Sequence, residues 1–94
     1  MRSKTVADII AEWQSVSLGL PAAGDLKPSD LPKAAAAFTF AGVPKYARAG
    51  WPELFWPWRR PRFRPGEQRE NLVRAGALIL AELERLERLE GSGT

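Results

Sequence analysis

The stretch EQRENLVRAGALILAELERLERL, residues 67–89, decides the fold of this 94-residue chain. Apolar residues and one glycine recur in it at steps of four, three, four and three. The residues on this stripe are Leu72, Gly76, Ile79, Leu83 and Leu86. Because an α-helix completes a turn in about 3.6 residues, such steps place all five on one face, in the heptad pattern of helices that pack against other helices. The stretch therefore predicts a long amphipathic helix over about residues 67–89.

A shorter helix is predicted near the N-terminus, over about residues 6–16. Its apolar residues also recur at helical spacing, at Val6, Ile9, Ile10, Trp13 and Val16. Thr5 precedes them as the expected N-cap, with Asp8 three residues further on. Glycines and prolines over residues 19–30 then break the pattern, so the helix is expected to end before them.

A second short helix is predicted over about residues 30–41. Ser29 is its expected N-cap, and Asp30 lies in the first turn, where a negative charge suits the helix dipole. Gly42 is the expected C-terminal stop. Four consecutive alanines, residues 34–37, leave room for another helix to approach closely.

Residues 43–66 connect the second and third predicted helices and are rich in proline and aromatic side chains. Loops of this length are uncommon in compact domains and are often functional. We expect this loop to pack against the three helices. The sequence thus predicts an all-α fold in a single small domain, residues 1–90, followed by a flexible tail at residues 91–94.

Composition excludes several kinds of site. The chain has no cysteine and no histidine, which removes disulfides, thiolate nucleophiles, the commonest general base and the commonest metal ligand. The longest apolar run, AGALILA at residues 75–81, is far too short to span a bilayer. We therefore expect a cytoplasmic protein that makes no membrane contact and has neither catalytic residues nor a metal site nor a cofactor.

The positive charge is concentrated in one segment. The whole chain carries a net charge of +3, but residues 45–64 hold six lysines and arginines against one glutamate. Local basicity of this kind describes one surface rather than the whole protein, and it favours an anionic partner.

Within that segment, WPWRRPRFRP at residues 56–65 interleaves aromatic, basic and proline residues. The tryptophans have two interpretations: they fold over the helices as part of a small core, or they stack on a base. The arginines are either a solvated rim or a phosphate site, since a guanidinium group offers a planar, bidentate fork. The candidate ligand-binding residues are Trp56, Trp58, Arg59, Arg60, Arg62 and Arg64.

The glutamates of the long helix invite comparison with all-helical nucleotide pyrophosphohydrolases of the MazG type. Such enzymes hold magnesium with carboxylates that converge from more than one helix. Here Glu84 and Glu87 share a face, but the second helix offers only Asp30 at its start. A solvated face with ion pairs is the favoured interpretation.

Several segments resemble small accessory proteins encoded by bacteriophages and prophages. They are DIIAEW at residues 8–13, DLPKAAAAFTFAG at 30–42, WPW at 56–58 and RENLVRAGALILAELERLER at 69–88. The individual matches are Trp56, Pro57, Trp58, Arg69, Leu72, Val73, Arg74, Glu82, Glu84 and Arg85. Asn71 stands where that family usually has aspartate. The resemblance implies a phage origin and an accessory role.

Two segments depart from that family. Residues 16–30 lack the acidic, histidine-containing loop that usually joins the first two helices, so no metal or acid–base role of that loop carries over. Residues 59–65, RRPRFRP, are more basic than the tryptophan, lysine and proline that the family has there.

The expected function is a phage-encoded, non-enzymatic binding protein that counters host antiviral defence. Its most concrete form is a sponge that sequesters an anionic nucleotide second messenger. The alternatives are an inhibitor of a defence effector protein, such as an anti-CRISPR, and an accessory protein that binds single-stranded nucleic acid. We also expect a homo-oligomer, because the long helix carries more apolar surface than two shorter helices can cover.

Overall fold

The computed structural model describes residues 3–19 and 26–93, and this part of the chain is helical without any strand. The all-α prediction is confirmed. The described ranges contain the α-helices α1 (Ser3–Gly19), α2 (Asp30–Ala41), α3 (Pro44–Arg48), α4 (Trp51–Phe55) and α5 (Gln68–Gly93), and the 3-10 helix η2 (Arg60–Arg62). The three-helix count is therefore wrong. The segment expected as a loop, residues 43–66, folds into two short helices and a 3-10 turn.

Prolines explain why short helices form in that segment. Pro44 and Pro52 each stand in the first turn of their helix, where the missing amide hydrogen costs nothing and the fixed φ angle suits a helix. Gly50 separates the two helices with a φ angle of 83°, a left-handed conformation that side chains with a Cβ rarely adopt. Only Ala49 and Gly50 therefore join the two helices.

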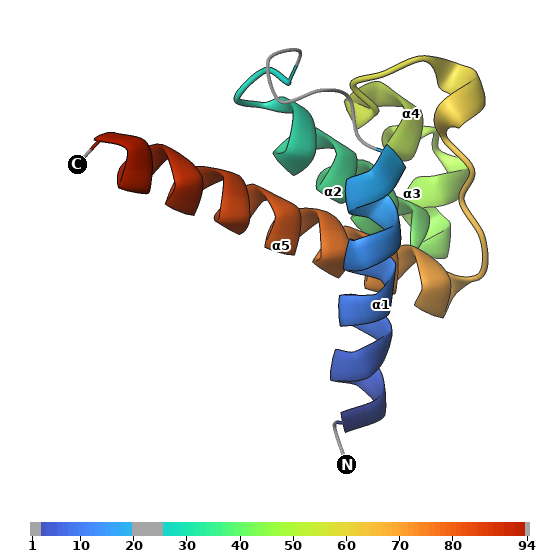
Figure 1. The fold of residues 1–94 in the computed structure, drawn as a ribbon. Coiled ribbons are helices and arrows are strands. Elements are labelled where there is room, and N and C mark those ends of the chain that lie inside the picture. Colours follow the sequence, from blue (N-terminus) through green and yellow to red (C-terminus); the bar gives the residue numbers. More distant parts are fainter. Residues whose placement is uncertain (1–2, 20–25, 94) are drawn as a thin grey trace.

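The long helix α5 is the central element (Figure 1). Helix α2 lies along it, α1 crosses it, and α3 and α4 pack on the far side of α2. The C-terminal half of α5 extends beyond the other helices. The chain measures 44 × 35 × 18 Å, so it is a flat body about two helices thick.

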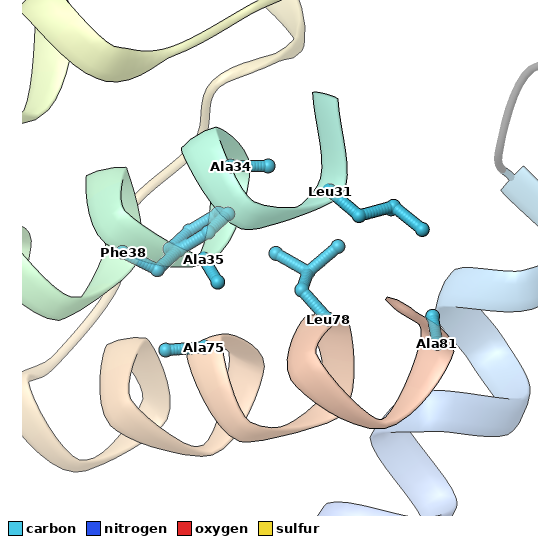
Figure 2. Packing of buried hydrophobic residues seen from close by; sticks show 7 residues of the cluster. All are labelled: Leu31, Ala34, Ala35, Phe38, Ala75, Leu78 and Ala81. Carbon is cyan, nitrogen blue, oxygen red and sulfur yellow. The ribbon is translucent and has the colours of Figure 1, made fainter. Parts of the chain in front are cut away.

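The core lies between α2 and α5 and consists largely of small side chains (Figure 2). Its fully covered members are Leu31, Ala34, Ala35, Phe38, Ala75, Leu78 and Ala81. Leu78 points from α5 toward Leu31 and Ala35 of α2. This is the close helix approach that the alanine run predicts.

The face of α5 that is buried is not the predicted heptad stripe. Burial falls on Asn71, Ala75, Leu78 and Ala81, which we call the inner face, and also on Ala77. Gly76 lies under Ile9 of α1, since a Cβ there would stand 3.4 Å from the Ile9 side chain. The other stripe residues, Leu72, Ile79, Leu83 and Leu86, are between 41% and 57% exposed, and we call them the outer stripe.

The helix ends agree with the sequence only in part. Helix α1 begins at Ser3, which places the expected N-cap Thr5 inside the helix. Ser29 does occupy the N-cap of α2 but makes no side-chain cap. Instead the Lys27 N–H donates to the Asp30 carboxylate at 2.9 Å. The expected break at residues 19–30 falls partly on residues 20–25, outside the described residues. The helical assignment of α5 continues through Gly93, where a tail was expected.

Asn71 ties the start of α5 to two other segments. It is 2% exposed. Its side-chain amide donates to the Ala41 and Gly66 carbonyls, both at 3.1 Å, and its oxygen accepts from the Gly66 N–H at 2.7 Å. An aspartate here would lose both donors. The amide therefore fixes where residues 43–66 leave α2 and where they join α5.

Candidate functional site

The two predicted site tryptophans lie against the core. The Trp56 ring contacts Phe38 edge-on at 5.7 Å between centroids, and it contacts Phe63 at 4.9 Å and Trp58 at 5.1 Å. Its indole N–H donates to the Arg59 carbonyl at 2.9 Å. Both indole rings are half-buried and pack on the α2–α5 core. This packing favours a scaffolding role for the tryptophans over base stacking.

The four predicted site arginines follow the tryptophans in the chain and are exposed to solvent. Arg60 and Arg62 belong to η2, and Arg59 and Arg64 flank it in exposed backbone. All four side chains are exposed, and none has an ion pair or hydrogen bond with any of the described residues. No acidic group of this part of the chain neutralises them, so the positive potential stays available to a ligand.

This arginine segment, residues 59–64, is held at several points. The 3-10 turn closes with the Arg62 N–H donating to the Arg59 carbonyl at 3.0 Å. Phe63 packs on Phe38 with ring centroids 5.1 Å apart. Arg74 of α5 donates to the Arg64 carbonyl at 2.6 Å. A segment anchored in this way has little backbone entropy to lose when a ligand binds.

A second aromatic group lies on the other side of α2, and the sequence analysis did not identify it. Phe40, Tyr46, Trp51 and Phe55 form it, and we call it the aromatic ladder. Phe55 stacks on both Phe40 and Trp51, with centroids 5.2 and 6.4 Å apart. Trp51 is 40% exposed, and Leu54 beside it is 78% exposed. The signal was present in Pro44, Gly50 and Pro52, which mark two short helices that fold back on α2.

Two further basic residues border the aromatic ladder. Lys45 and Arg48 lie on α3 beside Tyr46, and both are exposed without a partner among the described residues. Exposed aromatic rings beside unpaired basic groups are the usual composition of a surface that binds single-stranded nucleic acid.

The groove between α1 and α5, of about 300 Å³, has a different character. Its arginines are already paired: Arg69 contacts Asp8 at 3.0 Å, and Arg74 lies 3.7 Å from Glu12. Hydrogen bonds from Lys4 and then Arg69 lower the pKa of the Asp8 carboxyl below its ordinary value. The charges of this groove cancel, which makes it a weaker candidate for an anion than the arginine segment.

Two glutamates of α5, Glu82 and Glu84, pair with arginines of the same helix. Arg85 donates twice to the Glu82 carboxylate, at 2.8 and 2.9 Å, and this contact raises the pKa of Arg85. Glu84 lies 3.7 Å from Arg88. Among residues 3–19 and 26–93, no three acidic side chains gather where they could hold a metal ion.

No protein-family model matches this chain, and neither the curated proteins nor the solved structures yield a match. None of the helices in the described ranges has the length and apolar character needed to cross a membrane. The site therefore has to be judged on its own chemistry.

Proposed function

We propose that this protein is a non-catalytic binding protein for a phosphate-bearing nucleotide ligand, and that Arg59, Arg60, Arg62 and Arg64 supply the contacts. The observation that carries the proposal is the set of four exposed, unpaired guanidinium groups on one anchored segment. Like charges held this close repel one another, so the arrangement lowers the stability of the free protein. Binding of an anion relieves that repulsion.

The ligand class that we propose first is a small nucleotide second messenger with two or three phosphates, captured as by a sponge. Four arginines within six residues match so small a number of phosphates. The sequence resemblance to phage accessory proteins supports the proposal that this activity serves counter-defence against a bacterial host. The proposed protein would act by lowering the free concentration of the messenger, without turnover.

A second candidate is single-stranded nucleic acid, and the aromatic ladder favours it. A strand that follows residues 43–66 would meet Lys45 and Arg48 on α3 before the arginine segment. Trp51, at 40% exposure, offers aromatic surface for a base along that path. Such a ligand needs an open surface rather than an enclosed pocket.

Titrations at several salt concentrations distinguish the two ligands. A strand neutralised at many phosphates releases many counterions, so its affinity falls steeply with added salt, whereas a cyclic dinucleotide or trinucleotide gives a shallow slope. Small molecules released by heating the protein, after purification from cells with active defence, provide the first probes. If the affinity for single strands is high and increases with their length, and small nucleotides do not bind, the second candidate is correct and the sponge proposal is wrong.

The arginines are tested by single substitutions. Arg60→Ala or Arg62→Ala removes a charge-assisted hydrogen bond worth about 1.5–3 kcal/mol, so affinity should fall about tenfold to a hundredfold with an unchanged melting temperature. Arg88→Ala is the matched control, since Arg88 is equally basic, 74% exposed and remote on α5. Wild-type affinity in both site variants would remove the anion-binding function.

A further inference from the structure

The outer stripe of α5 is covered at its start, where a Cβ on Gly42 would stand 2.9 Å from the Leu72 side chain, but it is about half exposed at Ile79, Leu83 and Leu86. Leu83 is 57% exposed and Ile79 50% exposed, although both stand in the middle of a long helix. Figure 1 shows that the C-terminal half of α5, which carries Leu83 and Leu86, extends past the other helices. Large apolar side chains in such a row, on a helix that packs on its other sides, indicate a contact surface.

The total accessible surface of the chain also indicates a contact surface. A compact monomer of 10.4 kDa is expected to expose about 5,400 Å². This chain exposes 6459 Å², about 1,000 Å² more. That excess is close to the roughly 800 Å² that each partner contributes to a standard protein interface. One chain therefore carries about as much surplus surface as one side of a dimer requires.

We propose that the partner is a second copy of this chain, and that the two α5 helices pack antiparallel through their outer stripes. A heptad spacing is matched by another helix of the same spacing, and two identical stripes satisfy each other in an isologous contact. The two-fold axis passes near Leu83, so that Ile79 of one copy lies near Leu86 of the other. Gly76, covered by Ile9, stays outside the contact.

Charge and shape favour the antiparallel orientation. In a parallel pair, Glu82 of each copy would face Glu87 of the other across the flank of the stripe, and two like-charged pairs would form. An antiparallel pair also opposes the two helix dipoles favourably. The antiparallel arrangement also places helices α1–α4 of the two copies at opposite ends of the dimer, so that the projecting halves of α5 can meet. In the antiparallel pair only one like-charged pair forms, because the two Glu82 side chains meet near the two-fold axis while Glu87 faces Leu80 of the other copy.

The mass in solution tests the interface. Sedimentation equilibrium at micromolar concentration should give twice the 10.4 kDa chain mass for the wild type. Leu83→Lys should weaken the dimer by about thirtyfold or more, because a charge would be buried at the centre of the contact. Leu54→Lys is the matched control: Leu54 is 78% exposed but lies on α4, so this variant should dimerise like the wild type. Circular dichroism confirms that each variant remains helical.

Disulfide cross-linking tests the orientation of the two α5 helices. The chain has no cysteine, so only the introduced cysteines can form disulfides. When Ile79→Cys and Leu86→Cys proteins are mixed and oxidised, the antiparallel pair should give mainly the mixed disulfide dimer. Each variant alone should cross-link poorly. Efficient cross-linking of Ile79→Cys with itself would overturn the orientation. A wild type that stays monomeric at every concentration, or a dimer that survives Leu83→Lys unchanged, would overturn the interface.

Discussion

The two apolar faces of α5 meet different surroundings. The inner face carries small side chains, with Ala75, Leu78 and Ala81 each at most 5% exposed. The outer stripe carries larger ones and remains about half exposed. The difference lies in α2, whose alanines allow its backbone to lie close to the equally small residues of α5. Which face of α5 is buried depends on how closely α2 and α5 fit together. The hydrophobicity of α5 alone does not predict that face.

The largest expected effect contrasts Leu78 with Leu83. Leu78→Ala should lower the free energy of unfolding by about 2–5 kcal/mol, because it opens a cavity between the two helices. Leu83→Ala should lower the free energy of unfolding by less than about 1 kcal/mol when the protein is dilute enough to be monomeric, because the Leu83 side chain then faces water. Urea denaturation followed by tryptophan fluorescence at low protein concentration measures both. Equal losses in the two variants would contradict the assignment of the inner face.

An intermediate effect is expected at the adjacent pair Asn71 and Leu72. Asn71→Ala removes three part-buried hydrogen bonds, to the Gly66 N–H and to the Gly66 and Ala41 carbonyls, which should cost about 1–3 kcal/mol. Leu72→Ala, one residue further on and 45% exposed, should cost less. Hydrogen exchange should show faster exchange at the start of α5 in the Asn71 variant. If the Leu72 variant proves the less stable of the two, the hydrogen bonds of Asn71 contribute less to stability than the Leu72 side chain does.

The smallest effect concerns the side of α5 that α1 covers, where polar contacts border the groove. The folded-state pKa of Asp8 is lowered, chiefly by hydrogen bonds from Lys4 and Arg69. A lowered pKa means that the ionised carboxylate stabilises the fold above the ordinary value of 3.8, and that this contribution is lost as the pH falls through the folded-state pKa. Thermal melts from pH 6 down to about pH 2 should therefore show a small acid-dependent loss that Asp8→Asn lacks. A melting temperature that falls equally in Asp8→Asn and in the wild type would contradict this role of Asp8.

Sequence periodicity predicted α1, α2 and α5 but missed the short helices α3 and α4, and it chose the wrong face of α5. The range 30–41 is the same in prediction and structure, because Ser29, Asp30 and Gly42 mark its ends. Periodicity ranks faces by hydrophobicity, and by that measure the outer stripe exceeds the alanine-rich inner face. The burial of Asn71 had no signal in the pattern, since its three hydrogen bonds depend on where Ala41 and Gly66 come together.

The candidate site was predictable in its residues but not in their roles. Aromatic and basic residues alternate in the sequence, and the fold separates them: Trp56 and Trp58 turn toward the core, while Arg59, Arg60 and Arg62 stay exposed. The aromatic ladder was not predictable from local spacing. Phe40 and Phe55 are fifteen residues apart and meet only because Gly50 reverses the chain.

The flatness of the molecule has a kinetic consequence. A body only 18 Å thick has no room to surround a nucleotide, since walls on both sides of a ligand need more than two layers of helices. A molecule bound at the arginine segment would stay open to water along one side and would enter without any lid having to move. Association should then approach the rate set by diffusion and electrostatic attraction, so that affinity is decided by how quickly the ligand leaves.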